Sequence, residues 1–143
     1  MNRRRRKKLS RALVWAAGNG ETGTVRRLLR RGASPELPDA DGTTPLYAAS
    51  VHGAADVVGL LLTAGALPDT ESGHGDEGTP LCGAACWGHT ETVRRLLAQG
   101  ADPRLREDRG TGLTPLAWAE HGPYPQTAAL LRAAADSRPP TAG

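Results

Sequence analysis

The sequence predicts an all-α solenoid of about four helix-turn-helix repeats joined by short hairpin-like loops. Two markers recur with nearly the same period. The tripeptide Thr-Pro-Leu occurs at residues 44–46, 79–81 and 114–116, a spacing of 35, and Gly-Ala occurs at 32–33, 65–66 and 100–101, at spacings of 33 and 35. Between the markers an apolar i, i+3, i+4 pattern repeats, as in Val93, Leu96 and Leu97. A helical stripe with this period predicts helix pairs that bury their apolar faces by stacking.

Each marker occurs where a helix pair needs it. A threonine hydroxyl can cap the first helix of a pair, and the proline after it occupies the first helical position, where its missing N–H costs little. Glycine allows the tight turn inside a pair and the left-handed residue that ends the second helix. The predicted caps are Thr44, Thr79 and Thr114; the predicted turn and stop glycines are Gly20, Gly53, Gly88 and Gly32, Gly65, Gly100.

We expect three segments along the chain. A disordered basic tail spans 1–9, the repeat domain spans 10–136, and a disordered C-terminal tail spans 137–143. The repeats are expected at about 10–38, 39–73, 74–108 and 109–136. The first copy lacks Thr-Pro, and the fourth replaces the valine of the stripe with Thr127 and carries Pro123 and Pro125 at its inner turn. Terminal repeats are commonly atypical, since one side of each has no neighbour.

The formal net charge of +3 comes from one short segment. Six cations form an electrostatic tail, without which the remaining chain has a charge of −3: Arg3, Arg4, Arg5, Arg6, Lys7 and Lys8. No apolar stretch has the length of a signal-peptide core or a membrane span, so we expect a soluble, cytoplasmic protein and, as the default, a monomer. Heavy use of Arg, Ala, Gly and Pro is typical of a GC-rich genome and favours a small bacterial protein.

The sequence contains no motif for catalysis or for a cofactor. Neither Gly-x-Ser-x-Gly nor a Gly-x-x-x-x-Gly-Lys-Ser/Thr phosphate loop occurs, and no lysine follows residue 8. Cys82, Cys86 and His89 could supply three zinc ligands, but a fourth is missing, so we expect no metal. The cysteines are four apart in a predicted helix, where bridging geometry is poor, and we expect free thiols. We therefore expect no enzyme and no small-molecule substrate.

Two segments carry the most specific motifs. Residues 39–49 have the pattern Asp-x-Asp-Gly-Thr-Thr-Pro-Leu-Tyr-x-Ala, and residues 88–103 begin Gly-His-Thr-Glu-Thr-Val and end Gly-Ala-Asp-Pro. These resemble the ankyrin repeat, whose signature is Thr-Pro-Leu-His-x-Ala with a period of about 33 residues. The resemblance covers roughly residues 10–136. Other residues replace the signature histidine, and with it we expect its hydrogen bonds between helices and loops to be absent; the replacements are Val14, Tyr47, Cys82 and Ala117.

The resemblance implies a non-catalytic module that binds another protein through its loop tips and concave face. Carried over by position, the expected contact residues are Asn19, Asp41, Thr43, Val51, His52, Asp76, Glu77, Cys86, Trp87, Thr111, Leu113 and His121. Trp87 is expected to be an exposed anchor, whereas Trp15 and Trp118 are expected in the core. Carboxylates at the central tips favour a partner with a basic or neutral patch.

An alternative gives the tail the leading role. Arg3–Lys8 would tether the repeats to nucleic acid or to an anionic membrane, and the repeats would present a second partner. The commoner interpretation of such a run is a solvated end. Salt separates the hypotheses, because phosphate contacts weaken steeply as salt rises.

Overall fold

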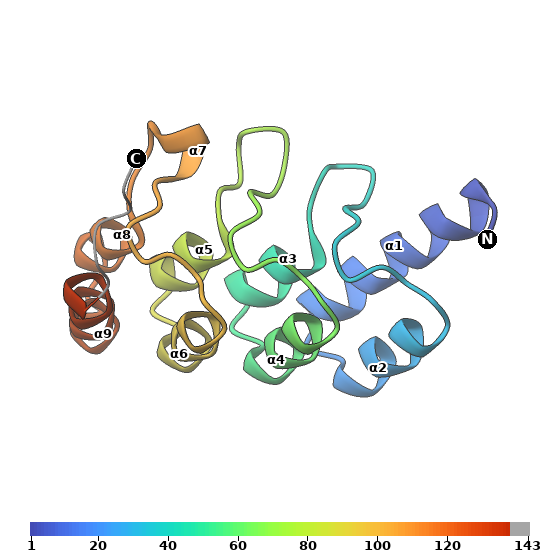
Figure 1. Cartoon of the computed structure of the whole chain (residues 1–143), viewed down its shortest axis with the longest axis horizontal. Helices are drawn as coiled ribbons and strands as arrows, with labels where there is room; N and C mark the ends of the chain where they lie inside the picture. Colours follow the sequence, from blue (N-terminus) through green and yellow to red (C-terminus); the bar gives the residue numbers. More distant parts are fainter. Residues whose placement is uncertain (138–143) are drawn as a thin grey trace.

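The described chain forms two parallel rows of helices. The structure, a computed structural model, describes residues 1–137; most of the expected C-terminal tail, residues 138–143, lies outside them. Figure 1 shows α1, α3, α5 and α8 in one row and α2, α4, α6 and α9 in the other, with the loops between pairs rising above the first row. The predicted solenoid of about four helix pairs is confirmed. The bounds are α1 Arg3–Gly18, α2 Thr22–Arg30, α3 Pro45–Val51, α4 Ala55–Thr63, α5 Pro80–Cys86, α6 Thr90–Ala98, α7 Glu107–Gly110, α8 Pro115–His121 and α9 Pro125–Ser137.

The predicted threonine caps begin α3, α5 and α8. Each hydroxyl accepts a hydrogen bond from the backbone N–H three residues later, and each following proline lies in the first turn. This cap satisfies one of the N–H groups that a helix start leaves without a partner. The bonds, all 3.2 Å long, join Tyr47 N to Thr44, Cys82 N to Thr79 and Ala117 N to Thr114.

Neighbouring pairs bury an aliphatic core between them. The helices of the first row pack in the order α1, α3, α5, α8, and those of the second in the order α2, α4, α6, α9. Leu46 and Leu81 are 1% exposed, and Leu61 and Leu96 are fully buried. Burying one such side chain stabilises the fold by about 1.5–3 kcal/mol. Ala84 and Ala85, also fully buried, keep α5 narrow enough for close packing on both sides.

The fourth pair closes onto the third through a tyrosine. Gly88 has a φ of 69°, in the left-handed region that favours glycine. A Cβ there would overlap the ring of Tyr124, so the bare backbone is what lets this ring pack against the turn. Directly after Tyr124, Pro125 begins α9, whose 13 residues exceed the 9 of α6. The prolines that replace the usual inner turn therefore accompany a fully formed helix pair.

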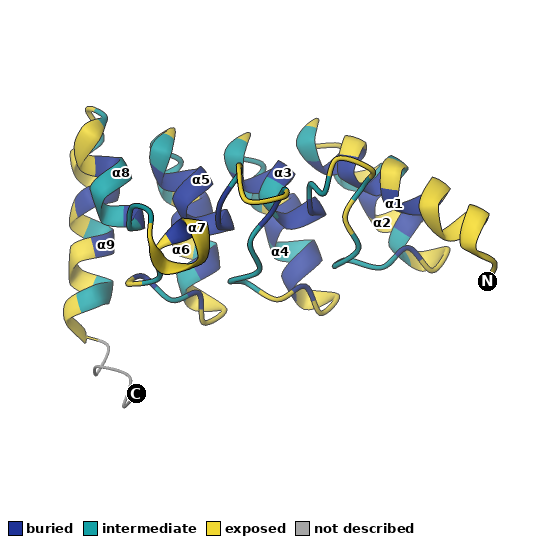
Figure 2. Cartoon of the chain, turned by 90° about the horizontal axis from the view of Figure 1, so that it is seen from above, coloured by how far each residue is buried: buried dark blue, intermediate teal, exposed yellow. Residues whose placement is uncertain are grey.

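The prediction of a disordered basic tail is wrong for residues 3–9, which form the first turns of α1. Asn2 caps the helix, because its Oδ1 accepts a hydrogen bond of 2.9 Å from Arg5 N. Leu9, 5% exposed, fixes the segment to the core. Arginine and lysine are good helix formers, so a helix anchored downstream extends readily through them. Figure 2 shows this basic end exposed and projecting past α2.

No helix among residues 1–137 is both long enough and apolar enough to cross a bilayer.

Leu81→Ala is expected to lower the free energy of unfolding by about 2–5 kcal/mol, because the lost side chain leaves a cavity in the core. Urea unfolding followed by far-UV circular dichroism measures the change. Leu67→Ala is the matched control, since Leu67 is 60% exposed, and it should shift stability by less than about 0.5 kcal/mol. Equal losses in the two variants would contradict this assignment of the core.

Candidate functional site

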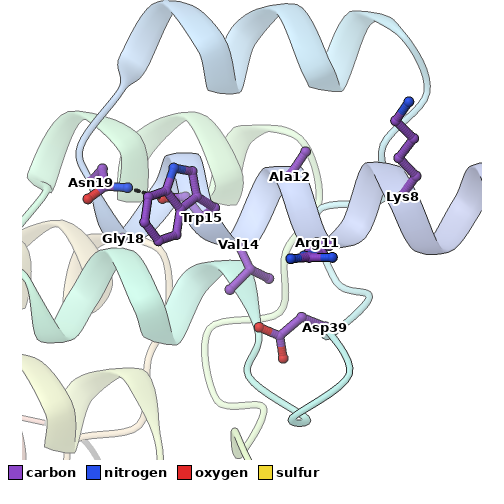
Figure 3. A pocket seen from close by; sticks show the side chains of 8 residues that line it. All are labelled: Lys8, Arg11, Ala12, Val14, Trp15, Gly18, Asn19 and Asp39. Atoms are coloured by element: carbon purple, nitrogen blue, oxygen red, sulfur yellow. Dashed lines mark hydrogen bonds between the residues drawn. The ribbon is translucent and has the colours of Figure 1, made fainter.

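Two cavities open on the side where the loops overhang the helices of the first row. We call the cavity around α5 the third-repeat cavity and the cavity beside α1 the N-terminal cavity. Their volumes are about 340 Å³ and about 710 Å³, respectively. The third-repeat cavity is lined by Tyr47, Val51, Asp76, Glu77, Cys82, Gly83, Cys86, Trp87, Glu107, Asp108 and Trp118. The N-terminal cavity, shown in Figure 3, is lined by Lys8, Arg11, Ala12, Val14, Trp15, Gly18, Asn19 and Asp39.

The third-repeat cavity brings together five of the twelve expected contact residues: Val51, Asp76, Glu77, Cys86 and Trp87. Thr43 and Leu113 contact its lining residues, through Glu77 and Cys82 respectively. Asn19 instead lines the N-terminal cavity. The remaining four are exposed and line neither cavity: Asp41, His52, Thr111 and His121.

Two loop carboxylates of this cavity are held in fixed positions. The Thr43 hydroxyl donates hydrogen bonds of 2.8 and 3.0 Å to the two oxygens of Glu77. The Trp118 indole N–H donates one of 2.7 Å to Oε1 of Glu107, which is 8% exposed. Both acids belong to the loops before Thr79 and Thr114, which are two residues longer than the loop before Thr44. The two longer loops therefore supply the buried or hydrogen-bonded carboxylates that line the cavity.

The surroundings of Glu107 shift several pKa values in the cavity. Burial raises the pKa of Glu107, the charges of Asp108 and Glu71 act in the same direction, and the Trp118 hydrogen bond opposes them. Burial and the charges of Glu77 and Glu107 raise the pKa of Tyr47 to about 12. The phenol is therefore neutral at physiological pH and remains a hydrogen-bond donor beside the carboxylates.

The negative charge of the loop carboxylates that line this cavity is not balanced by a cation from the described chain. The salt bridges within residues 1–137 involve Arg94, Arg95 and Arg132, which pair with acids on α4, α6 and α8. Within the same residues, no lysine or arginine forms an ion pair with the loop carboxylates Asp76, Glu77, Glu107 or Asp108.

Three aromatic side chains complete the cavity, and only Trp87 is among the expected contact residues. Trp87 is 58% exposed at the end of α5. Tyr47 fits beside α5 because position 83 is glycine, where a Cβ would lie 3.0 Å from Tyr47 Cε2. A glycine inside a predicted helix costs helix stability and can mark a packing constraint, so Gly83 is the sequence signal for Tyr47. Trp118 was assigned to the core, and no motif indicated Glu107.

The prediction that Trp15 belongs to the core is wrong, since its side chain is 71% exposed. At the equivalent position of later repeats, the residue lies against the preceding first-row helix: Ala48 faces Gly18, and Gly83 faces Tyr47. Within residues 1–137 no helix pair packs against that side of the first repeat, which leaves Trp15 uncovered. Trp118, in the last repeat, is half-buried and packs against the core.

The Cys82, Cys86 and His89 side chains do not form a common metal site. The Cys82 thiol donates to the carbonyl oxygen of Leu113 over 3.6 Å, and His89 Nε2 donates to that of Val51 over 3.1 Å. Among residues 1–137, no group of three His, Cys, Asp or Glu side chains is placed to hold a metal ion. Cys82 replaces the signature histidine, and its weak hydrogen bond to Leu113 connects α5 to the loop of the next repeat. The expectation that hydrogen bonds from this position are absent is therefore wrong for Cys82.

The two thiols are expected to differ in reactivity. Burial raises the pKa of Cys82 to about 12, and burial and the charge of Glu107 raise the pKa of the half-exposed Cys86. Because the thiolate is the reactive form, a chromogenic thiol reagent at about pH 8 should modify Cys86 slowly and Cys82 only after unfolding. Cys82→Ser should leave the slow phase unchanged. Rapid modification of both thiols in the folded protein would contradict this environment.

Glu107→Gln is expected to stabilise the protein near neutral pH, since glutamine still accepts the Trp118 hydrogen bond without a buried charge. The raised pKa means that the folded state binds the Glu107 proton more tightly than the unfolded chain does, so wild-type stability falls as pH rises through that pKa. The advantage of the variant should therefore shrink as pH is lowered through the same range. Urea unfolding over a pH series measures it, and a variant less stable than wild type at neutral pH would show that the charge is stabilising.

Comparisons with known proteins agree with this architecture. A family model described as "Ankyrin repeats (3 copies)" matches residues 2–72, and one described as "Ankyrin repeat" matches residues 76–108. Palmitoyltransferase AKR1 of Saccharomyces cerevisiae is 42% identical over 55 residues, which are 38% of this chain and 7% of that protein. Ankyrin repeat domain-containing protein 39 of Homo sapiens is 40% identical over 60 residues, 41% of this chain and 33% of that protein.

The matched segments thus cover at most a third of either relative, so the similarity concerns the repeats and not the whole proteins. The two profile matches together extend over most of the chain and include the first three helix pairs, α1 to α6. The chain therefore belongs to the ankyrin-repeat family.

Proposed function

We propose that this chain is a non-catalytic module that binds another protein through its loop tips and first-row helices, and that the third-repeat cavity receives a basic side chain of the partner. Ankyrin repeats are generally protein–protein interaction modules. The observation that carries the finer proposal is a cavity whose fixed carboxylates and aromatic rings lack a cation from the described chain.

An arginine or lysine side chain fits the chemistry of this cavity. Glu77 and Glu107 offer carboxylate oxygens held by Thr43 and Trp118, so the partner does not have to order them on binding. A guanidinium can pair with carboxylates in a bidentate arrangement and can also stack on an indole or phenol face. The same guanidinium would then form both the ion pair with the carboxylates and the cation–π contact with an aromatic ring.

Trp87 is proposed as the apolar anchor beside this charge contact. Its indole is 58% exposed and lines the cavity, so a partner could cover much of an aromatic surface. Tryptophans covered in this way are common hot spots of binding energy. Peripheral contacts are proposed at four exposed residues of the same loops and helices: Asp41, His52, Thr111 and His121.

The segment shared with the yeast palmitoyltransferase is 7% of that protein, so the similarity assigns no transferase activity to this chain. We further propose a cytoplasmic location. The observation in its favour is that both cysteines are free thiols, as is usual in a reducing compartment.

Trp87→Ala is expected to weaken partner binding about thirtyfold, the effect of losing a hot spot worth about 2 kcal/mol. Immobilised full-length protein would capture the partner from host lysate under a high-salt wash, and titration with the purified partner would give Kd. Glu77→Gln keeps the size of the side chain and one acceptor oxygen but removes the charge, so it should weaken binding and reduce its salt dependence.

Leu67→Ala serves as the control, because it removes an exposed apolar side chain outside the cavity. It should bind as wild type does, and circular dichroism should show the same helix content in all variants. Unchanged affinity in both Trp87→Ala and Glu77→Gln would rule out the third-repeat cavity as the contact site.

A further inference from the structure

We propose that the N-terminal cavity, together with the side of α1 that leads into it, is a second docking surface, and that it binds an acidic protein segment carrying an apolar side chain. This surface is lined by different residues from the third-repeat cavity and has the opposite charge. It would stand even if the proposed function of the third-repeat cavity failed.

One side of α1 combines cations with an exposed tryptophan. Arg4, Lys8, Arg11 and Trp15 follow one another at spacings of three or four residues, which places them along one side of a helix. Lys8, Arg11 and Trp15 line the same cavity, and Figure 3 shows them in this order along α1. The stripe therefore leads from the basic helix end into the cavity.

The cations of this stripe are available to a ligand. Arg4, Lys8 and Arg11 are exposed, and within residues 1–137 none of them forms a salt bridge. Asp39 is the one acidic residue that lines the N-terminal cavity. Its Oδ1 accepts hydrogen bonds of 2.9 Å from Asp41 N and 3.1 Å from Thr43 N, so this carboxylate is engaged in its own loop. The cationic side of the cavity thus favours incoming carboxylates.

The apolar part of the surface is Trp15 with its neighbours. The indole is 71% exposed, Val14 and Ala12 line the cavity beside it, and Gly18 adds no side chain next to it. Asn19 ends the helix here, where its side chain donates a hydrogen bond of 3.0 Å to the Trp15 carbonyl oxygen. An exposed indole on rigid helical backbone is suited to binding an apolar side chain.

The spacing along α1 defines the ligand further. Lys8 and Trp15 are seven residues apart, which corresponds to about 10 Å at the helical rise per residue. A binding segment should therefore place its acidic and apolar residues about 10 Å apart. That is two turns of a helix or about three residues of an extended chain.

The wall opposite the cations favours a protein segment over other anions. Single-stranded nucleic acid usually stacks its bases on several aromatic side chains, whereas this cavity offers Trp15 alone and carries Asp39 facing the α1 stripe. A flat membrane surface cannot follow a stripe that runs into a cavity between α1 and a loop. Binding of single-stranded nucleic acid and binding of a membrane are each measured as separate outcomes of the test.

The experiment selects peptides from a displayed random library on full-length protein at about 150 mM salt, where long-range attraction between exposed charges is largely screened. Full-length variants are used because a chain starting at Ser10 would lose the Asn2 cap and the buried Leu9. The enriched peptides are synthesised and titrated by fluorescence anisotropy. A single-stranded oligonucleotide and vesicles containing phosphatidylserine are titrated in parallel.

The variants test the tryptophan and the cations of the surface separately, and they distinguish both from the effect of a change in net charge. Trp15→Ala removes the anchor, and Lys8→Glu with Arg11→Glu reverses the charge. Arg26→Glu with Arg30→Glu makes the same change of charge at exposed positions of α2. Trp87→Ala tests whether the peptides bind at the third-repeat cavity instead. Circular dichroism checks that each variant is folded.

The proposal expects enriched peptides with acidic and apolar residues at the stated spacing. Trp15→Ala and the Lys8/Arg11 reversal should each weaken them at least tenfold, while the Arg26/Arg30 reversal and Trp87→Ala leave them unchanged. It is overturned if no peptide is enriched, if the enriched peptides lack acidic residues, or if Trp15→Ala has no effect. It is also overturned if the oligonucleotide or the vesicles bind through Lys8 and Arg11 and no peptide does.

Discussion

Each helix pair of this protein has an apolar side that only the next pair can cover, and the rest of the structure follows from this constraint. Leu46 and Leu81 are 1% exposed because α1, α3, α5 and α8 pack in sequence order. The same stacking aligns the loops, so Thr43 reaches Glu77 and His89 reaches Val51, partners 34 and 38 residues apart. One row of helices and one row of loops consequently form a continuous face, and the side chains of that face come from several repeats.

The constraint also explains why the two cavities differ in charge. In the middle of the stack, a residue facing the preceding repeat is covered, and the functional groups come from the loops, where Glu77 and Glu107 lie. Among the described residues, no helix pair packs against the outer side of the first repeat. Trp15 therefore remains 71% exposed, and α1 can continue past α2 as a helix of cations. An interior repeat offers loop carboxylates, whereas the first repeat offers the uncovered side of a helix.

The period, the threonine caps and the core stripe could be predicted because each has a local signature that stacking reinforces. The position of Trp15 could not, because its register indicates a covered residue and only its place at the end of the stack exposes it. The path of the last loop had no signature either. Asp108 and Arg109 have φ values of 52° and 57°, a conformation rare for residues other than glycine, next to the buried carboxylate of Glu107. The sequence therefore indicated acidic loop tips but not which acid would enter the cavity.

The N-terminal cavity is cationic and the third-repeat cavity is acidic, so the two ends of the binding face differ in charge. The N-terminal cavity belongs to the first repeat and the acidic cavity to the third, and the second helix pair packs against both neighbours, which fixes the distance between the cavities. A partner with a basic and an acidic segment could lie along this face in one orientation and would meet like charge in the other, a penalty that gives specificity more than raw affinity. A partner that occupied both cavities would also bind the second as an intramolecular event, so its affinity would depend on whether its two segments match the repeat spacing. On this argument, lengthening the stack by one repeat between the cavities would alter selectivity without changing any contact residue.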